Sequence, residues 1–174
     1  DKSIQEKLKN VETIYPELRK LLLRTEEFRV FPDSRTLSGG DDWKWLSLNE
    51  KFLSNNQIKK SLDLLDINTF FGFYPFISKL EPNSYIAPHC GSTTFRHRIH
   101  LGISIPEPKA SFIKVDSIKY HWRDGKAFIF DDSLIHEVKH DGNLARVVFI
   151  IDIWPSSIDK KTRNFLEGRF FWLN

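Results

Sequence analysis

The sequence has little cysteine, no long apolar run and almost no excess charge, and each shortage excludes a class of protein. Cys90 is the only cysteine among the 174 residues, which excludes an intrachain disulfide and a cysteine-based zinc or iron–sulfur site. The longest apolar run, 147–151, ends at Asp152 and is far shorter than the about 20 residues that cross a membrane. Basic and acidic residues are interspersed and leave a formal charge of only +3. We therefore expect no transmembrane segment and no nucleic-acid partner.

A single cysteine is typical of a reducing compartment, so we expect a cytoplasmic protein. Methionine is absent, so the initiator lies outside this sequence and the expectation rests on cysteine usage alone. Apolar residues, by contrast, are plentiful: 40% of the chain is hydrophobic and 15 residues are Phe. This content can offset the chain entropy of one compact domain, which we assign to residues 1–174.

Helical spacing predominates in residues 1–67. Apolar side chains recur at steps of three and four across 3–28, and Pro16 is expected to divide this stretch into two helices. A capping box at 54–57 predicts a further helix that packs on a sheet. Residues 32–42 carry turn formers without periodicity and predict a loop.

Residues 68–155 follow a different pattern, with short runs of Phe, Ile, Val and Tyr between turn signals at 82–83, 124–125 and 141–142. This pattern indicates an antiparallel β region. Residues 156–174 predict a C-terminal helix, capped by Ser156 with Asp159, and an apolar tail. The whole is typical of an α+β fold, mainly β, in which helices back a β-sandwich or barrel.

The strand predicted at 96–105 carries polar residues at alternate positions. Arg96, Arg98 and His100 share one face, and the odd positions are mostly apolar. This face could meet water, as in a half-buried strand, or line the cavity of a small barrel. In a barrel, the two arginines and the histidine would suit an anionic ligand.

Two histidines stand at predicted strand edges, His89 before that strand and His136 after the strand that contains Phe130. If they meet across a barrel, their neutral imidazoles suit Fe(II). Arg146 begins the apolar strand RVVFIIDIW, ten residues after His136. Its guanidinium is a natural anchor for the far carboxylate of a dicarboxylic cosubstrate.

A rival motif overlaps the second histidine. His136-Glu137-Val138-Lys139-His140 matches H-E-x-x-H, in which a helix presents two zinc ligands and a glutamate base of a metalloprotease. The motif requires an uninterrupted helix, whereas its flanking segments read as strands and a turn follows at 141–142. We keep a zinc protease as the lesser alternative.

Three segments closely resemble the aspartyl/asparaginyl β-hydroxylase family of Fe(II)- and 2-oxoglutarate-dependent dioxygenases: PHCGSTTFRHRIHLGISIP, WRDGKAFIFDDSLIHEV and RVVFIIDIWP, within residues 73–155. The resemblance implies a double-stranded β-helix with His89 and His136 as iron ligands and no other catalytic residue. It also implies that 2-oxoglutarate is held by four residues, Ser78, Arg98, His100 and Arg146. Gly91 stands where a third, carboxylate ligand is usual in related oxygenases. The sequence departs from the family at two places. Trp154 directly precedes Pro155, whereas the family often has a histidine between them. His140 stands at a position where the family usually has a residue that does not bind metal.

The resemblance implies an oxygenase that uses Fe(II), O₂ and 2-oxoglutarate to hydroxylate an aliphatic carbon. The expected carbon is the β-carbon of an aspartyl, asparaginyl or similar amino-acid substrate, which is free, peptide-bound or carrier-bound. The family also contains enzymes that act on lipid A acyl chains. The glycine at 91 leaves halogenation open, because chloride or water could fill the third position. A β-helix module that binds a small dicarboxylate or a protein partner without turnover is the other alternative.

Overall fold

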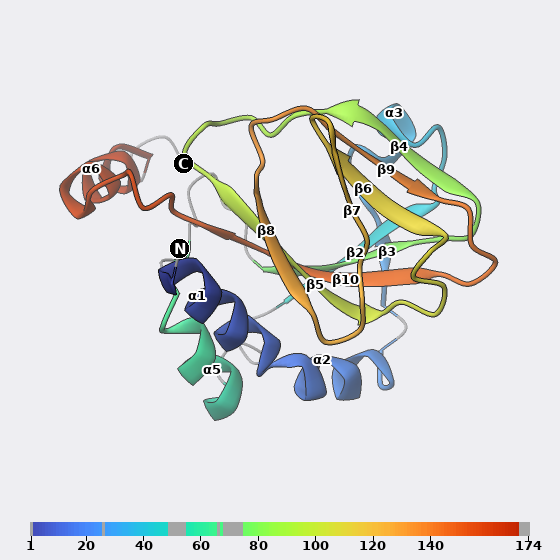
Figure 1. The fold of residues 1–174 in the computed structure, drawn as a ribbon, viewed down its shortest axis with the longest axis horizontal. Helices are drawn as coiled ribbons and strands as arrows, with labels where there is room; N and C mark the ends of the chain where they lie inside the picture. The colour runs from blue at the N-terminus through green and yellow to red at the C-terminus, as the bar shows by residue number, and fades with distance from the viewer. Residues whose placement is uncertain (1, 26, 49–54, 66, 68–74, 171–174) are drawn as a thin grey trace.

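Two antiparallel sheets face each other and enclose the interior of the protein (Figure 1). In this computed structural model, which describes residues 2–25, 27–48, 55–65, 67 and 75–170, the larger sheet has the order β1-β2-β3-β10-β5-β8 and the smaller β4-β9-β6-β7. The strands are β1 (Arg29–Val30), β2 (Trp43–Ser47), β3 (Phe76–Leu80), β4 (Ser84–His89), β5 (His97–Ser104), β6 (Ser111–Val115), β7 (Ile118–Tyr120), β8 (Ala127–Asp131), β9 (His136–His140) and β10 (Arg146–Ile153).

Strands β3 to β10 form a double-stranded β-helix. The chain passes from the larger sheet (β3) to the smaller (β4), back to β5, across to β6 and β7, and then through β8, β9 and β10 in the same alternating way. Strands far apart in the sequence therefore become neighbours, as β10 does between β3 and β5. The fold class expected from the sequence is confirmed.

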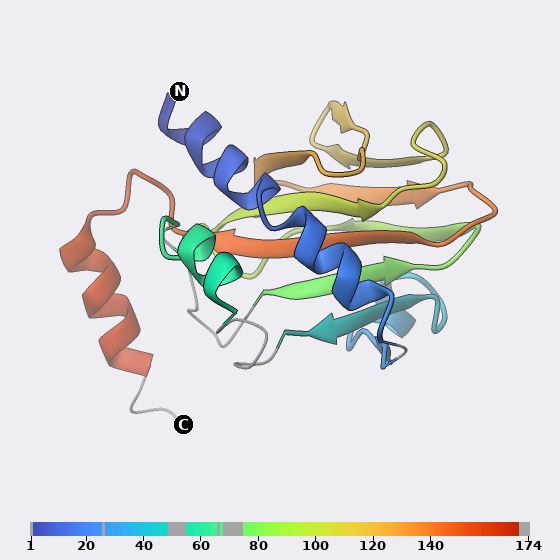
Figure 2. The same cartoon turned by 90° about the horizontal axis from the view of Figure 1, so that it is seen from below.

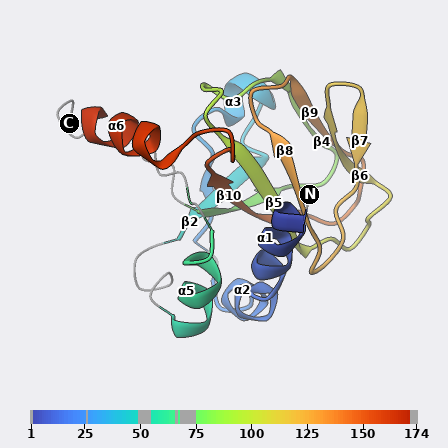
Figure 3. The same cartoon turned by 60° about the vertical axis from the view of Figure 1, so that its left-hand side comes forward.

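Helices cover the outer face of the larger sheet, as Figures 2 and 3 show for α1, α2 and α5. The described helices are α1 (Lys2–Glu12), α2 (Tyr15–Leu22), α3 (Ser34–Leu37), α5 (Asn56–Leu62) and α6 (Lys160–Phe170). The predicted split at Pro16 is confirmed, because Pro16 lies in the first turn of α2, where its missing N–H leaves no helical hydrogen bond unmade. None of the described helices is long and apolar enough to cross a membrane.

The two faces of the larger sheet have different partners. Ile99, Leu101 and Ile103 of β5 point outward and pack in one apolar cluster with α1 and α2 residues such as Val11 and Leu18. The inward side chains of the same sheet join a second cluster, which is rich in aromatic rings. Strand alternation thus separates an aliphatic outer core from the interior of the barrel.

Residues 1–67, expected to be helical, also contain β1 and β2, which extend the larger sheet beside β3. These strands were missed because β1 is stabilised by pairing with β2 and β2 by pairing with β3, and no local pattern reveals such pairing. The loop expected at 32–42 contains the single helical turn α3. This turn is held by the buried Ser34 hydroxyl, which donates to the Gly40 carbonyl at 2.6 Å.

Two helix caps differ from those expected. In α5 the Asn55 side chain accepts the Ile58 N–H at 3.4 Å, and Ser54 of the predicted capping box lies outside the described residues. In α6 the cap is Asp159, which accepts the Thr162 N–H at 2.9 Å. Figures 1 to 3 show α6 projecting to one side of the barrel, which agrees with the 55% exposure of its Phe165. The predicted apolar tail lies largely outside the described residues.

Candidate active site

The polar face of β5 lines a cavity between the two sheets. His100 is buried and Arg98 is only 15% exposed at its side chain, so the water-facing interpretation of this strand is wrong. The cavity wall includes all six residues implicated by the sequence, namely Ser78, His89, Arg98, His100, His136 and Arg146. The rest of the wall is apolar, with residues from both sheets.

His89 and His136 meet at one end of this cavity. They end β4 and begin β9, stand directly opposite each other in the strand register, and place their ring centroids 4.3 Å apart. Each Nδ1 lies 2.8 Å from a backbone carbonyl, that of Ala87 or Leu134. Such a bond fixes the proton on Nδ1 and leaves the Nε2 lone pair available. Burial lowers the pKa of His136, which favours the neutral form that binds metals.

Asp132 also belongs to this end of the cavity, although the sequence analysis treated it only as part of a turn. Its carboxylate is fully buried and lies 3.8 Å from Nε2 of His136. Burial alone would raise the pKa of Asp132, but the guanidinium groups of Arg98 and Arg96 outweigh that effect and lower it. Asp132 is therefore an ionised carboxylate beside the histidine pair.

The position expected to be vacant at Gly91 is filled by this carboxylate. A Cβ on Gly91 would lie 1.9 Å from Oδ2 of Asp132 and 2.8 Å from an Arg96 nitrogen, and the Gly91 N–H donates to the Asp132 carbonyl at 2.7 Å. Glycine is required here because Asp132 approaches so closely. Within the described ranges, no three His, Cys, Asp or Glu side chains are arranged to bind a metal together.

The arginines near the histidines belong to a neutral network of four charges. Arg98 donates to both oxygens of Asp152, at 2.8 and 3.0 Å, and also lies 2.9 Å from Asp132. Arg96 donates to Asp132 through two nitrogens, at 3.0 and 2.5 Å. Two buried cations are thus matched by two buried anions, as burial of charge requires.

Arg146 lies at the other end of the cavity and has no such match. It is 2% exposed, no carboxylate in the described part of the chain pairs with it, and its Nε and Nη1 atoms make no hydrogen bond there. Burial lowers its pKa to about 9, which reflects the cost of an uncompensated buried cation. An anionic ligand would remove that cost.

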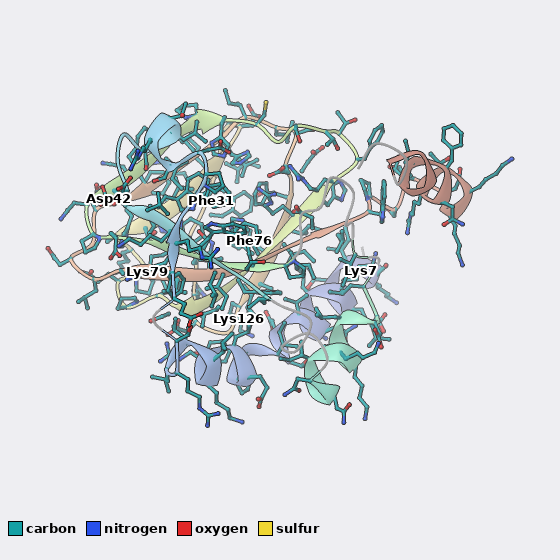
Figure 4. All side chains as sticks on the ribbon, turned by 180° about the vertical axis from the view of Figure 1, so that it is seen from behind. Lys7, Phe31, Asp42, Phe76, Lys79 and Lys126 are labelled. Carbon is teal, nitrogen blue, oxygen red and sulfur yellow. The ribbon has the colours of Figure 1, made fainter. Side chains whose placement is uncertain are left out.

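An aromatic wall flanks the histidine end. Phe31 stacks on Trp43, with centroids 3.9 Å apart, and lies 5.8 Å from Phe76 (Figure 4). The indole N–H of Trp43 donates to the Ser78 hydroxyl at 3.1 Å, which fixes that hydroxyl in the cavity. Trp43 of β2 and Phe31, which directly follows β1, thus bring residues of the segment expected to be helical into the wall of the cavity.

The zinc-protease alternative is wrong. Residues 136–140 form β9 and not a helix, so the motif lacks the geometry that places two histidines on one metal. Glu137 points away from the cavity and accepts the Tyr85 hydroxyl at 2.5 Å. His140 is held by the Leu144 carbonyl through its Nε2, at 2.8 Å.

These observations define a double-stranded β-helix protein whose cavity joins two facing histidines to a buried arginine, with which no carboxylate of the described residues pairs. The family model described as aspartyl/asparaginyl beta-hydroxylase matches residues 8–155. The chain therefore belongs to the aspartyl/asparaginyl β-hydroxylase family.

Among curated relatives, the aspartyl/asparaginyl beta-hydroxylase of Homo sapiens is 37% identical over 91 residues, which cover 52% of this chain and 12% of that protein. The ornithine lipid ester-linked acyl 2-hydroxylase of Rhizobium tropici is 32% identical over 156 residues, 83% of this chain and 54% of the relative. The chain thus spans between an eighth and about half of these relatives. Among solved structures, the Schizosaccharomyces pombe Cnp3 cupin domain aligns with a TM-score of 0.44 and 9% identity, over 73% of this chain and 72% of that one.

Proposed function

We propose that this chain is an Fe(II)- and 2-oxoglutarate-dependent dioxygenase that hydroxylates an aliphatic carbon with O₂. The observation that carries the proposal is Arg146, a buried cation without a carboxylate partner among the described residues, in the same cavity as a facing histidine pair. A small dicarboxylate that spans the cavity would neutralise the arginine at one end and reach the histidines at the other.

The donor set fits a divalent iron ion. His89 and His136 would hold it through Nε2, because both Nδ1 atoms are occupied by backbone carbonyls. Two neutral imidazoles leave several coordination positions for small ligands. When bound, Fe(II) would supply the O₂ chemistry that breaks an aliphatic C–H bond. Asp132, 3.8 Å from His136, would accept a hydrogen bond from any water held beside the histidines.

The cosubstrate contacts divide between the two ends. We assign the far carboxylate of 2-oxoglutarate to Arg146, assisted by the Ser78 hydroxyl, and the metal-chelating end to His100 and Arg98. Arg98 already pairs with two carboxylates, so its charge is largely neutralised and His100 is the more available donor. The apolar walls between the two ends would exclude water.

Asp132 favours hydroxylation over halogenation. Halogenation requires a halide at the position of the missing ligand, beside Gly91. A carboxylate already fills the space that a Gly91 side chain would take, which leaves less room for a halide there. We therefore propose hydroxylation.

The substrate we propose is an aspartyl, asparaginyl or similar amino-acid group, free, peptide-bound or carrier-bound. A second candidate is an acyl chain, and a specific feature favours it. Leu134 and Ile135, directly before His136, are 46% and 58% exposed, so an apolar rim adjoins the histidines. The acyl 2-hydroxylase relative matches more of this chain than the human relative does.

The test is incubation of the protein with Fe(II), ascorbate and 2-oxoglutarate, with succinate release and product mass measured. Aspartyl and asparaginyl peptides form one arm and acyl-chain substrates the other. Substrate-dependent succinate with a gain of one oxygen, indifferent to chloride, is the expected outcome. A chlorine isotope pattern would overturn hydroxylation. Binding of 2-oxoglutarate by folded, iron-loaded protein without succinate in either arm would favour a binding module.

A further inference from the structure

Trp122 connects two of the residues assigned to the cosubstrate. It lies between β7 and β8 and is fully buried. Its indole Nε1 lies 3.3 Å from Nδ1 of His100, and the guanidinium carbon of Arg146 lies 4.4 Å from its ring centroid. One side chain therefore touches groups at both ends of the proposed ligand.

The contact with His100 decides which imidazole nitrogen carries the proton. An indole N–H can only donate, so Nδ1 of His100 must accept and carry no proton. The proton of a neutral His100 then lies on Nε2, and burial, followed by the positive charges of Arg98 and Arg146, lowers the pKa of His100 well below its ordinary value. The Nε2 atom is buried and has no hydrogen-bond partner in the described structure. It is a donor without an acceptor, in the wall of the cavity.

The contact with Arg146 orients a second donor. A guanidinium over an aromatic face is attracted by the ring quadrupole, and its N–H groups remain free at its edge. The indole thus holds the arginine in place without using the hydrogen bonds that a carboxylate would need.

We propose that Trp122 is a positioning residue for the cosubstrate, which holds His100 as the Nε2–H tautomer and Arg146 beneath its ring so that both donate to 2-oxoglutarate. The inference rests on the proposed function for the identity of the ligand. The predicted tautomer of His100, however, is a property of the ligand-free protein. The competing interpretation is that Trp122 only fills space in the core and positions neither His100 nor Arg146.

Trp122→Phe separates these roles, because it keeps an aromatic ring and removes the N–H. In the ligand-free protein, ¹⁵N NMR should show Nε2 of His100 protonated in the wild type and a mixture of tautomers in the variant. The matched control is Phe128→Leu, since Phe128 packs 5.6 Å from His100 and 6.1 Å from Trp122 between ring centroids but donates nothing. The control should keep the wild-type tautomer.

Binding of 2-oxoglutarate, measured by calorimetry without O₂ and with Mn(II) in place of iron, gives the second readout. Trp122→Phe should weaken binding about threefold to tenfold at neutral pH, the effect of one misplaced hydrogen bond. The loss of affinity should be the same at about pH 6 and about pH 8, because burial and the charges of Arg98 and Arg146 keep His100 neutral in both proteins. The charged and titratable neighbours of His100 are Arg98 on its own strand, Arg146 on β10 and His136 on β9; none is changed in the variant.

A wild-type His100 protonated on Nδ1 would overturn the inference, even if Trp122→Phe fails to fold. A folded Trp122→Phe protein with unchanged tautomer and unchanged affinity for 2-oxoglutarate would overturn it as well. Failure of the wild type to bind 2-oxoglutarate would instead overturn the proposed function, and the NMR result would stand apart from it.

Discussion

The arginines at the two ends of the cavity differ in whether carboxylates of the protein pair with them. At the histidine end, Arg96 and Arg98 are matched by Asp132 and Asp152 in a neutral network. At the other end, Arg146 is as deeply buried but no carboxylate in the described residues pairs with it. Buried arginine by itself therefore does not mark a ligand site. The difference lies in whether the protein supplies the counter-charge, and only the unmatched arginine requires one from outside.

The largest effect is expected from removing either histidine of the facing pair. His89→Ala or His136→Ala should abolish specific Fe(II) binding. The loss of metal affinity should exceed the about 10–100-fold that follows when a residue supporting a metal ligand is changed. His140→Ala is the control, since His140 is held by Leu144 at the other end of β9, and it should bind Fe(II) normally. Isothermal titration of ligand-free protein with Fe(II) under anaerobic conditions gives the measurement. If His136→Ala still bound Fe(II), the assignment of His136 as a metal ligand would be wrong.

Arg98→Met tests the matched end. It leaves Asp152 and Asp132 buried with less compensating charge, so the free energy of unfolding should fall by about 3–5 kcal/mol. Urea denaturation followed by circular dichroism measures this change. An unchanged stability would mean that the charge of Arg98 does not compensate the buried carboxylates of Asp132 and Asp152.

Arg146→Met tests the unmatched end and should give the opposite pattern. Removing a buried charge without a partner should leave stability equal or raised, whereas 2-oxoglutarate binding should weaken by about 2–5 kcal/mol, well over tenfold. Calorimetry and urea denaturation of the same sample separate the two effects. Lost stability with unchanged cosubstrate affinity would show that Arg146 serves the fold and not the ligand.

Gly91→Ala tests the packing beside the matched network. The new methyl group would lie within 1.9 Å of Asp132, so we expect a destabilisation of about 1–3 kcal/mol from overpacking. Gly40→Ala is the matched control, because a Cβ there would meet its nearest neighbour at an ordinary 3.5 Å. Thermal unfolding of both variants makes the comparison, and equal stabilities would show that Asp132 can move aside.

The smallest effect concerns the pH dependence of stability. Burial lowers the pKa of His140 below 6.5, so below that value the unfolded chain binds a proton that the folded chain resists. Stability should therefore fall as the pH drops from about 7.5 to about 5.5. His140→Gln should lose part of this slope, and the part due to the buried His100 and His136 should remain. An identical slope in the variant would mean that His140 titrates alike in both states.

The sequence predicts the site residues whose side-chain direction follows from the alternation of side chains along a strand. His100 and Arg98 lie two residues apart on one strand, and Arg146 begins another, so their shared direction follows from the period of a strand. Asp132 and Asp152 escaped notice because their meaning depends on arginines 34 to 56 residues away in the sequence. No local pattern reports such a pairing. The strands β1 and β2 were missed for the same reason, since each is defined by its neighbour in the sheet.

The helices α1, α2 and α5 provide none of the residues that line the cavity, yet the aliphatic outer face of the larger sheet lies under them. A shortened protein that began at β1 would present Ile99, Leu101, Phe149 and their neighbours to water. A continuous apolar surface of this kind promotes self-association. Any recombinant form of this protein therefore needs its first two helices for solubility, even though the proposed reaction would take place on the opposite side of the sheet.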